Sequence, residues 1–355
     1  MISFARGAPA PECLDAALLA DCARVAVERD PSVLAYGPGA GYGPLQEHLA
    51  ARHGVAAARV LLTTGGLQGF VFYAEELLAT RPGRVLVEAP TYDRPLKILR
   101  RLGADVRPVA MDGEGLDPDA LERELAAGGT SFLYTIPTFQ NPSGRTLSTE
   151  RRRRVVELVR ERGVPVLEDD PYGLVRYEGE PSPSLHELEG GELVTYASSF
   201  SKTVAPGLRA GWFVAPAELA ARLEARAVST YISPPFLTQA TVFELIDRGS
   251  FEPNLERVRG LLRVRRDAMR DALAAHLAGE ATWSEPEGGY FLWADLPVDA
   301  GALLERAEAA GVTFVRGSDF FPDGSGSQAA RFAFSYASPS EIEEGVSTLA
   351  SVLRA

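Results

Sequence analysis

The feature that most constrains the fold is a regular alternation of short apolar segments with longer amphipathic ones. Hydrophobic residues recur at helical spacing in the longer segments, whereas the apolar segments have the length of buried strands. Strands that alternate with helices in this way predict an α/β fold with a mostly parallel, doubly wound sheet. The expected strands are residues 60–63, 84–88, 106–110, 132–136, 164–167, 193–196 and 212–214.

The pattern changes after this region, and a chain of 355 residues is long enough to divide into two domains. A long helical pattern covers about residues 254–277, and short strands and helices follow it. We therefore expect a large domain over residues 31–250. A smaller α+β domain is expected to combine residues 251–355 with the N-terminal segment 1–30.

Charge and composition exclude several classes of partner. The formal net charge of -12 argues against nonspecific binding to nucleic acid or to an anionic membrane. No apolar run is long enough to span a bilayer, and the first residues lack the layout of a signal peptide. The four histidines are scattered without ligand spacing, so no metal site is expected.

The two cysteines bear on the compartment. Cys13 and Cys22 both fall on one helix expected over residues 13–29. Free, mostly buried thiols in a reducing cytoplasm are the simplest interpretation. We therefore predict a cytoplasmic protein without disulfides.

Polar side chains follow the expected strands of the large domain. Tyr92, Asn141, Asp169, Tyr172 and Lys202 each come shortly after a strand. Ligands of open α/β sheets bind beyond the carboxyl ends of the strands, so these side chains are expected to converge.

Lys202 stands between two apolar strands and allows two interpretations. It is either a surface residue in a turn or a desolvated amine that is neutral, and therefore nucleophilic, near pH 7. Ser199, Ser201 and Arg209 surround it in sequence and would form an anion site. The turn at Gly65 leads from strand to helix and suits a phosphate, although glycine is common in such turns for geometric reasons alone.

These motifs, in this order, resemble those of the fold-type I pyridoxal-phosphate enzymes, specifically the class I and II aminotransferases. The resemblance covers nearly the whole chain, and the subgroup of 2-aminoadipate and broad-specificity aminotransferases is the most similar. It implies the fold of these enzymes, the cofactor pyridoxal 5′-phosphate and a two-step, ping-pong transfer of an amino group from an L-amino acid to a 2-oxo acid. 2-Oxoglutarate is the expected acceptor.

The resemblance also implies a role for each matching residue. Lys202 matches the lysine that binds the cofactor as a Schiff base and then moves a proton. Asp169 matches the carboxylate that keeps the pyridine nitrogen protonated. Tyr172 and Asn141 match residues that bind the phenolic oxygen of the cofactor, and Tyr92 matches the residue that stacks on its ring.

The phosphate of the cofactor is expected to bind residues from three segments. Backbone N–H groups of two residues and side chains of three others would bind it: Gly66, Leu67, Ser199, Ser201 and Arg209. Many relatives carry Ser-Gln in place of Gly66-Leu67, so one side-chain contact is expected to be missing. Tyr36 matches a tyrosine that reaches the phosphate in the neighbouring subunit, which implies a homodimer with shared active sites.

The substrate is expected to bind through arginine. Arg331 matches the arginine that holds the α-carboxylate, with Asn141 beside it, because a guanidinium pairs with a carboxylate through two hydrogen bonds. Arg6 is a second candidate for a substrate contact, and it would suit a dicarboxylate. Aromatic residues on similar segments would suit an apolar side chain instead, and the sequence does not choose between the two.

Several alternatives stay open at this point. Tyr92 could be a core tyrosine, Arg331 could lie on the surface of an edge strand, and Asp169 could cap a helix. The same platform also supports other pyridoxal-phosphate reactions, such as those of lyases, decarboxylases and oxidases. A ligand sensor without catalysis is the alternative from another class of protein.

Overall fold

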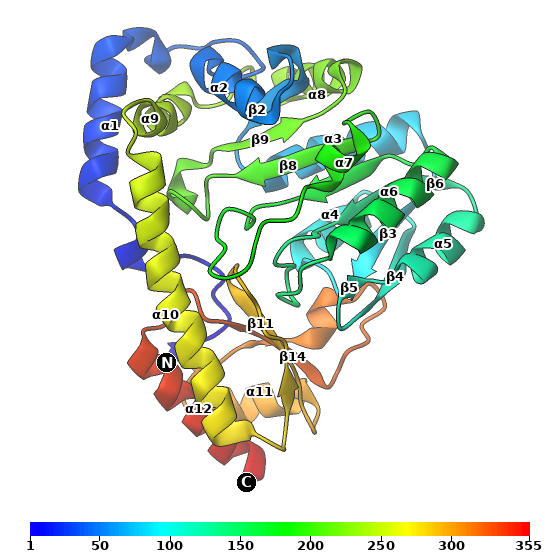
Figure 1. The fold of residues 1–355 in the computed structure, drawn as a ribbon, viewed down its shortest axis with the longest axis vertical. Coiled ribbons are helices and arrows are strands. Elements are labelled where there is room, and N and C mark those ends of the chain that lie inside the picture. The colour runs from blue at the N-terminus through cyan, green and yellow to red at the C-terminus, as the bar shows by residue number, and fades with distance from the viewer.

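The computed structural model describes residues 1–355, and its centre is an eight-stranded sheet. Figure 1 shows this sheet in the upper part of the molecule. In the order of the sheet, the strands are β2 (Val60–Thr63), β9 (Gly211–Val214), β8 (Val194–Ser199), β7 (Val166–Asp169), β6 (Thr130–Thr135), β3 (Arg84–Ala89), β4 (Val106–Asp112) and β5 (Gly115–Leu116).

The sheet is mostly parallel, which confirms the predicted fold class. β4, β3, β6, β7 and β8 form one parallel run, while β9 pairs antiparallel with both β8 and β2. Because two antiparallel steps restore the direction, β2 runs the same way as β8. The carboxyl ends of β2, β3, β6, β7 and β8 therefore meet at one edge of the sheet.

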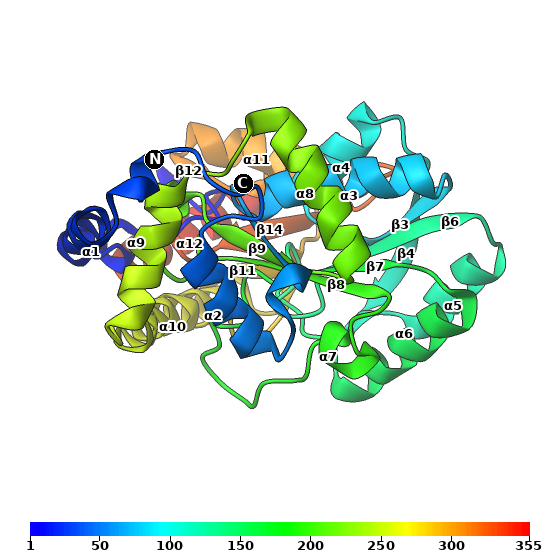
Figure 2. The same ribbon diagram turned by 90° about the horizontal axis from the view of Figure 1, so that it is seen from above.

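Helices cover both faces of this sheet, as Figure 2 shows from above. One face carries α3 (Gly66–Thr80), α4 (Asp93–Arg101) and α8 (Ala217–Tyr231), which share a hydrophobic core with the strands. The other face carries α5 (Pro118–Ala126), α6 (Thr149–Arg162) and α7 (Leu185–Glu189), with a second core. Cover on both faces explains why β2, β3, β6 and β9 are buried along nearly their whole length, whereas β4 near the edge is largely exposed.

A second, antiparallel sheet lies in the lower part of the molecule in Figure 1. Its order is β10 (Thr282–Trp283), β11 (Phe291–Asp295), β14 (Ala329–Ala333) and β13 (Val315–Arg316). It shares a core with α11 (Ala300–Ala309) and α12 (Pro339–Arg354). The long helix α10 (Phe251–Leu277) runs from the large sheet to this part.

The N-terminal strand β1 (Ile2–Ser3) pairs with β12 (Val312–Thr313), next to the second sheet. Residues 2–3 thus lie beside the C-terminal part, whereas the helix Ala16–Arg29 of the same segment packs against the helix Phe236–Asp247 of the expected large domain. The exact domain boundaries at residues 31 and 251 stay a prediction.

The prediction of one continuous helix over residues 13–29 is wrong. Cys13 ends a short 3₁₀ helix (Pro11–Cys13), and α1 (Ala16–Arg29) starts only after Asp15, whose carboxylate accepts a hydrogen bond from Leu18 N. An N-cap of this kind satisfies an N–H group that a continuous helix would already have bonded. Both cysteines are free and buried.

Two α-helices were not expected from the sequence, the short α7 and a longer one. The longer one is α9 (Phe236–Asp247), which begins directly after Pro235 and packs against α1 and α2 (Gly43–His53). Pro234 and Pro235 before it would suit a rigid loop, but proline is also well suited to the first turn of a helix. None of the helices combines the length and the apolar composition that a membrane span requires.

Candidate active site

A cavity of about 170 Å³ lies at the edge where the parallel strands end, and we call it the Lys202 pocket. It is formed by the segments that follow β2, β3, β6, β7 and β8, as expected for this type of sheet. Its lining residues are Gly66, Leu67, Phe70, Tyr92, Pro95, Ile136, Asn141, Asp169, Pro171, Tyr172, Ser199, Ser201, Lys202, Pro206 and Arg209.

The pocket contains every residue that the sequence assigned to the cofactor except Tyr36. Sequence reasoning missed the five apolar and proline residues of the lining, because these residue types have ordinary roles in cores and turns. The alternatives of a surface turn for Lys202 and a core position for Tyr92 do not fit this placement, since both line the cavity.

Burial and two nearby cations lower the basicity of the Lys202 amine. Nζ donates a hydrogen bond to Gly7 O at 2.8 Å and lies 5.0 Å from the centre of the Tyr290 ring. Burial, followed by the charges of Arg331 and Arg209, lowers the pKa of Lys202 to about 8. A substantial fraction of this amine is therefore neutral just above neutral pH, as a nucleophile or a base requires.

Asp169 ends strand β7 and faces the pocket from the sheet. Its Oδ2 accepts a hydrogen bond of 2.7 Å from the hydroxyl of Tyr134, a residue of β6 that the sequence did not single out. Burial raises the pKa of Asp169 to about 6, and the Tyr134 hydrogen bond opposes that shift. The pocket thus holds a carboxylate that is ionised at neutral pH close to a lysine of reduced basicity.

Arg331 is buried, with 7% of its surface exposed, and has no carboxylate partner. Nη1 donates to Asn141 Oδ1 at 3.1 Å and Nη2 donates to Ala5 O at 2.8 Å, while Nε has no hydrogen-bond partner. The guanidinium lies over the ring of Phe291, 4.2 Å from its centre. A buried cation with a free donor is costly unless an anion joins it, so the arrangement suits a carboxylate ligand.

The other end of the pocket is built for an anion. Helix α3 begins at Gly66 without a side-chain cap, so its first N–H groups are available at the positive end of the helix. Arg209 has φ of 50°, a left-handed conformation unusual for arginine, and its guanidinium donates to Thr64 O and Pro206 O. It has no acidic partner.

Glycine is required beside Arg209. Gly65 has φ of 82°, and a Cβ built on it would lie 2.4 Å from Arg209 Nη2. Gly211 also approaches Gly65 closely, because a Cβ built on Gly211 would lie 2.9 Å from Gly65 C. The backbone therefore forms a tight cradle around the guanidinium and the start of α3, which fits a phosphate group.

A buried carboxylate behind the pocket fixes the loop that carries Asn141. Glu88 accepts hydrogen bonds from Thr135 Oγ1 at 2.5 Å, from Ile136 N at 3.1 Å and from Gln140 Nε2 at 3.0 Å. Gln140 Nε2 also donates to Pro90 O at 2.8 Å. The loops after β3 and β6 are thereby joined, which positions Tyr92 and Asn141 relative to each other.

Three predicted site residues are not part of the pocket lining: Arg331, Tyr36 and Arg6. Arg331 is nevertheless adjacent to the pocket through its hydrogen bond to Asn141. Tyr36 is 80% exposed and lies on the surface. Arg6 places its guanidinium 4.1 Å from the centre of the Tyr336 ring and makes no ion pair. Its neighbours Ala5 and Gly7 nevertheless contact Arg331 and Lys202, so Arg6 belongs to a segment that borders the pocket.

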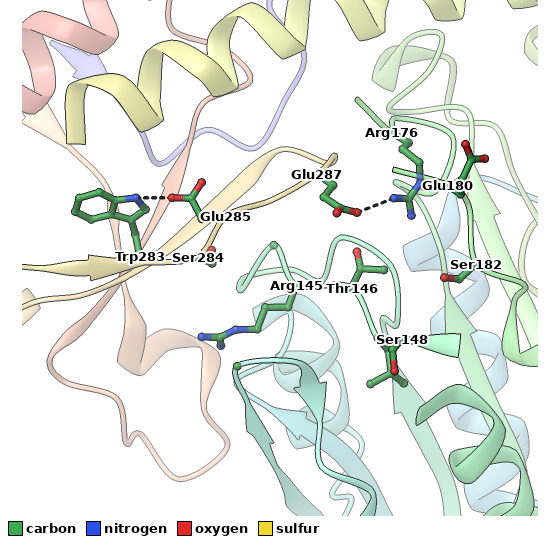
Figure 3. A pocket seen from close by; sticks show the side chains of 13 residues that line it. Arg145, Thr146, Ser148, Arg176, Glu180, Ser182, Trp283, Ser284, Glu285 and Glu287 are labelled. Carbon is green, nitrogen blue, oxygen red and sulfur yellow. Dashed lines mark hydrogen bonds and ion pairs between the residues drawn. The ribbon is translucent and has the colours of Figure 1, made fainter. Parts of the chain in front are cut away.

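A larger cavity of about 550 Å³ opens between the two parts of the molecule, and we call it the interdomain crevice (Figure 3). Arg176 there is paired with Glu287 at 3.0 Å, and Glu285 is paired with Arg270 at 2.5 Å. The crevice contains none of the residues that the sequence assigned to the site, although Arg145 and Gly144 on its wall follow Asn141 in the same loop.

Comparisons with known proteins agree with this geometry. The family described as aminotransferase class I and II matches residues 1–349. A 2-aminoadipate transaminase of Thermus thermophilus is 37% identical over 360 residues, with 100% of this chain and 90% of that protein covered. An aromatic-amino-acid aminotransferase of Thermococcus litoralis is 32% identical over 367 residues, with 100% and 88% covered.

A solved structure is similar along the whole chain. It is the α-aminoadipate aminotransferase LysN of Thermus thermophilus in complex with N-(5′-phosphopyridoxyl)-L-leucine. The TM-score is 0.95 at 36% sequence identity, and the match covers 100% of this chain and 92% of LysN. The ligand of that structure joins a phosphopyridoxyl group to an amino acid.

Proposed function

Because this chain belongs to the class I and II aminotransferase family and is a pyridoxal-phosphate-dependent transaminase, we propose that its reaction centre is the Lys202 pocket. The observation that carries this proposal is the meeting of three cations without acidic partners: two line the pocket, and the third is hydrogen-bonded to Asn141 of its lining. Lys202, Arg209 and Arg331 contribute an amine, a phosphate cradle and a carboxylate clamp.

When bound, pyridoxal phosphate supplies an aldehyde that takes up amino groups and a protonated ring that accepts electron density. Arg209, the N-terminus of α3, Ser199 and Ser201 would hold its phosphate. Lys202 would bind its aldehyde carbon and then, as a free amine, move a proton from Cα of the substrate. Asp169 would keep a proton on its ring nitrogen.

Asn141 and Arg331 act together in this proposal. The amide oxygen of Asn141 accepts a hydrogen bond from Arg331, which leaves the amide nitrogen as a donor toward the phenolic oxygen of the cofactor. Tyr172 would donate to the same oxygen, and Tyr92 would pack on the ring. Arg331 would fix the α-carboxylate of the amino acid and so orient its Cα toward the Lys202 amine.

For the amino acceptor we propose 2-oxoglutarate, with Arg6 as the contact of its second carboxylate. Arg6 has no acidic partner, and the residues on either side of it already contact Arg331 and Lys202. Replacing Arg6 by glutamine should raise KM for 2-oxoglutarate by about 10-fold or more and leave KM for pyruvate nearly unchanged. Equal effects on both acceptors would contradict this role.

We further propose a homodimer in which Tyr36 completes the phosphate site of the partner. Tyr36, Leu34, Val228 and Ile232 are exposed apolar side chains, and Gly37 N donates to Ser233 Oγ at 3.4 Å, so the segment of Tyr36 lies next to that of Ile232. Arg209 is also exposed in the single chain. A second copy of the chain would cover these apolar side chains and Arg209. Sedimentation should give twice the mass of one chain, and Tyr36→Phe should weaken cofactor binding without changing that mass. A stable monomer that binds the cofactor fully would contradict the proposal.

Borohydride reduction is the direct test of the reaction centre. Reduction of the protein with pyridoxal phosphate, followed by peptide mapping, should fix the label on Lys202. A panel of L-amino acids with 2-oxoglutarate should then yield glutamate and identify the donor. Label on another lysine would overturn the assignment of the pocket. The cytoplasmic location stays a prediction that rests on the two free cysteines.

A further inference from the structure

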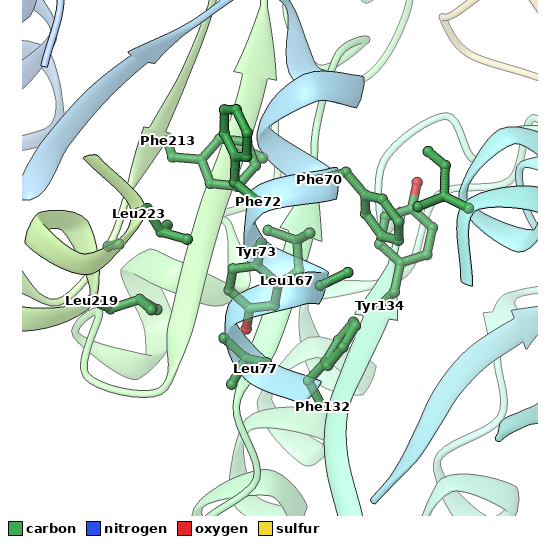
Figure 4. Packing of buried hydrophobic residues seen from close by; sticks show 14 of the residues in the cluster. Phe70, Phe72, Tyr73, Leu77, Phe132, Tyr134, Leu167, Phe213, Leu219 and Leu223 are labelled. Carbon is green, nitrogen blue, oxygen red and sulfur yellow. The ribbon is translucent and has the colours of Figure 1, made fainter. Parts of the chain in front are cut away.

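The carboxylate of Asp169 is held by a single side chain, that of Tyr134. The Tyr134 hydroxyl donates to Oδ2 at 2.7 Å, and no other protein group binds the carboxylate. Tyr134 lies on β6, beside the strand that carries Asp169, and is completely buried. Its ring packs edge-on against Phe70 at 5.1 Å between centres, as Figure 4 shows.

The direction of this hydrogen bond is determined by burial. Burial and the neighbouring carboxylate raise the pKa of Tyr134 well above that of a free phenol, so the hydroxyl keeps its proton. It is therefore a permanent donor, and a donor favours the ionised form of the carboxylate that accepts from it. Oδ1 of Asp169 is left without a protein partner.

We propose that Tyr134 is a positioning residue that acts through Asp169: it fixes Oδ2, keeps the carboxylate ionised and leaves Oδ1 for the ring nitrogen of the cofactor. This inference rests on the proposed role of Asp169 in the Lys202 pocket. The phenol opposes the effect of burial, which on its own would raise the pKa of Asp169 further and weaken its hold on a protonated ring.

The same core contains a matched control, Tyr73. It is completely buried in the same hydrophobic cluster, and its ring packs edge-on against Phe132 at 5.3 Å between centres (Figure 4). Its hydroxyl lies near Thr195, but neither hydroxyl makes a hydrogen bond of good geometry. Tyr73→Phe thus removes the same atom from the same core without touching Asp169.

The test measures binding of pyridoxal phosphate to the full-length chain between pH 5 and pH 8 for three proteins: the parent, Tyr134→Phe and Tyr73→Phe. Affinity should fall as pH drops through the pKa of Asp169, because a neutral carboxyl no longer pairs with the protonated ring. In Tyr134→Phe the midpoint, the pH at which half of this affinity change has occurred, should rise by about one pH unit. The dissociation constant at pH 7 should rise on the order of 10-fold.

Tyr73→Phe should keep both the midpoint and the affinity of the parent. A Tyr134→Phe protein that folds and binds like Tyr73→Phe would overturn the inference, and so would equal shifts in both variants. The visible spectrum of the bound cofactor gives a second measurement, since its pH dependence should change in Tyr134→Phe alone. Failure of the parent to bind the cofactor at Lys202 would instead reject the proposed function.

Discussion

The Lys202 pocket and the interdomain crevice differ in the way their charges are compensated. The crevice is the larger cavity, about 550 Å³ against about 170 Å³. Its Arg176 is paired with Glu287, whereas Arg331 and Lys202 in and beside the pocket donate only to neutral oxygens. Uncompensated cations in a small, partly buried space attract anions. Volume alone would have selected the crevice instead of the pocket that we propose.

From this contrast we expect the largest loss of activity when Lys202 is replaced. Lys202→Ala should lower the rate of amino transfer by about 10⁴-fold, because it removes both the attachment of the cofactor and the group that moves the proton. Lys202→Arg is the control that keeps the positive charge, and it should be impaired almost as much. Single-turnover absorbance of the bound cofactor with an amino acid measures the loss. A Lys202→Arg protein with nearly normal rates would mean that only the charge matters.

Replacing Arg331 by glutamine should have the next largest effect. The change removes the only buried cation assigned to the α-carboxylate, and we expect kcat/KM to fall by about 10²- to 10³-fold, mostly through KM. Arg331→Lys should recover only part of this loss, because an ammonium cannot form the paired hydrogen bonds of a guanidinium. Steady-state kinetics with one amino acid measure kcat/KM and KM for both variants. Unchanged KM in both variants would remove Arg331 from the substrate site.

The pH dependence of cofactor uptake should reflect the lowered pKa of Lys202. Only the neutral amine attacks an aldehyde, and the neutral fraction rises as pH passes through about 8. The rate of covalent uptake of added pyridoxal phosphate should therefore increase about 10-fold between pH 7 and pH 9 and then level off. Stopped-flow absorbance measures this rate. A rate that still climbs steeply above pH 9.5 would indicate an ordinary lysine.

The smallest effect should come from the crevice. Glu287→Gln breaks the ion pair with Arg176, but Glu287 is half exposed, so the free energy of unfolding should change by less than about 1 kcal/mol. Amino transfer and cofactor affinity should stay as in the parent. Denaturant unfolding and steady-state kinetics measure the two quantities. A large loss of activity would show that the crevice is coupled to the reaction centre.

The sequence predicted the parts of the site that lie in loops at strand ends. Asp169, Lys202 and Asn141 are polar residues that interrupt or follow apolar runs, so their position relative to the sheet could be read from the alternation alone. The parallel sheet itself followed from the same alternation. These features depend on residues that are close in the chain, so they can be recognised in the amino-acid sequence.

The supporting residues could not be predicted, because they look like ordinary core residues. Tyr134 lies inside an apolar strand and Glu88 lies near the end of another, and only the pairing of the strands brings them to Asp169 and Gln140. Helix α9 was missed for a similar reason, since the proline pair before it allows both a loop and a helix start. Sequence spacing does not carry the distances between strands that decide these contacts.

The backbone carbonyl groups of Ala5 and Gly7 compete with a ligand for hydrogen bonds from Arg331 and Lys202. Their carbonyl oxygens accept from Nη2 of Arg331 and from Nζ of Lys202, so a ligand oxygen aimed at either atom competes with a neutral oxygen of the chain itself, while Nε of Arg331 stays free. Charged acceptors form hydrogen bonds roughly twice as strong as neutral ones. An ionised carboxylate should therefore displace the backbone carbonyl groups of the N-terminal segment. The neutral carbonyl oxygen of the corresponding amide or ester forms hydrogen bonds no stronger than those of the backbone and should not displace them.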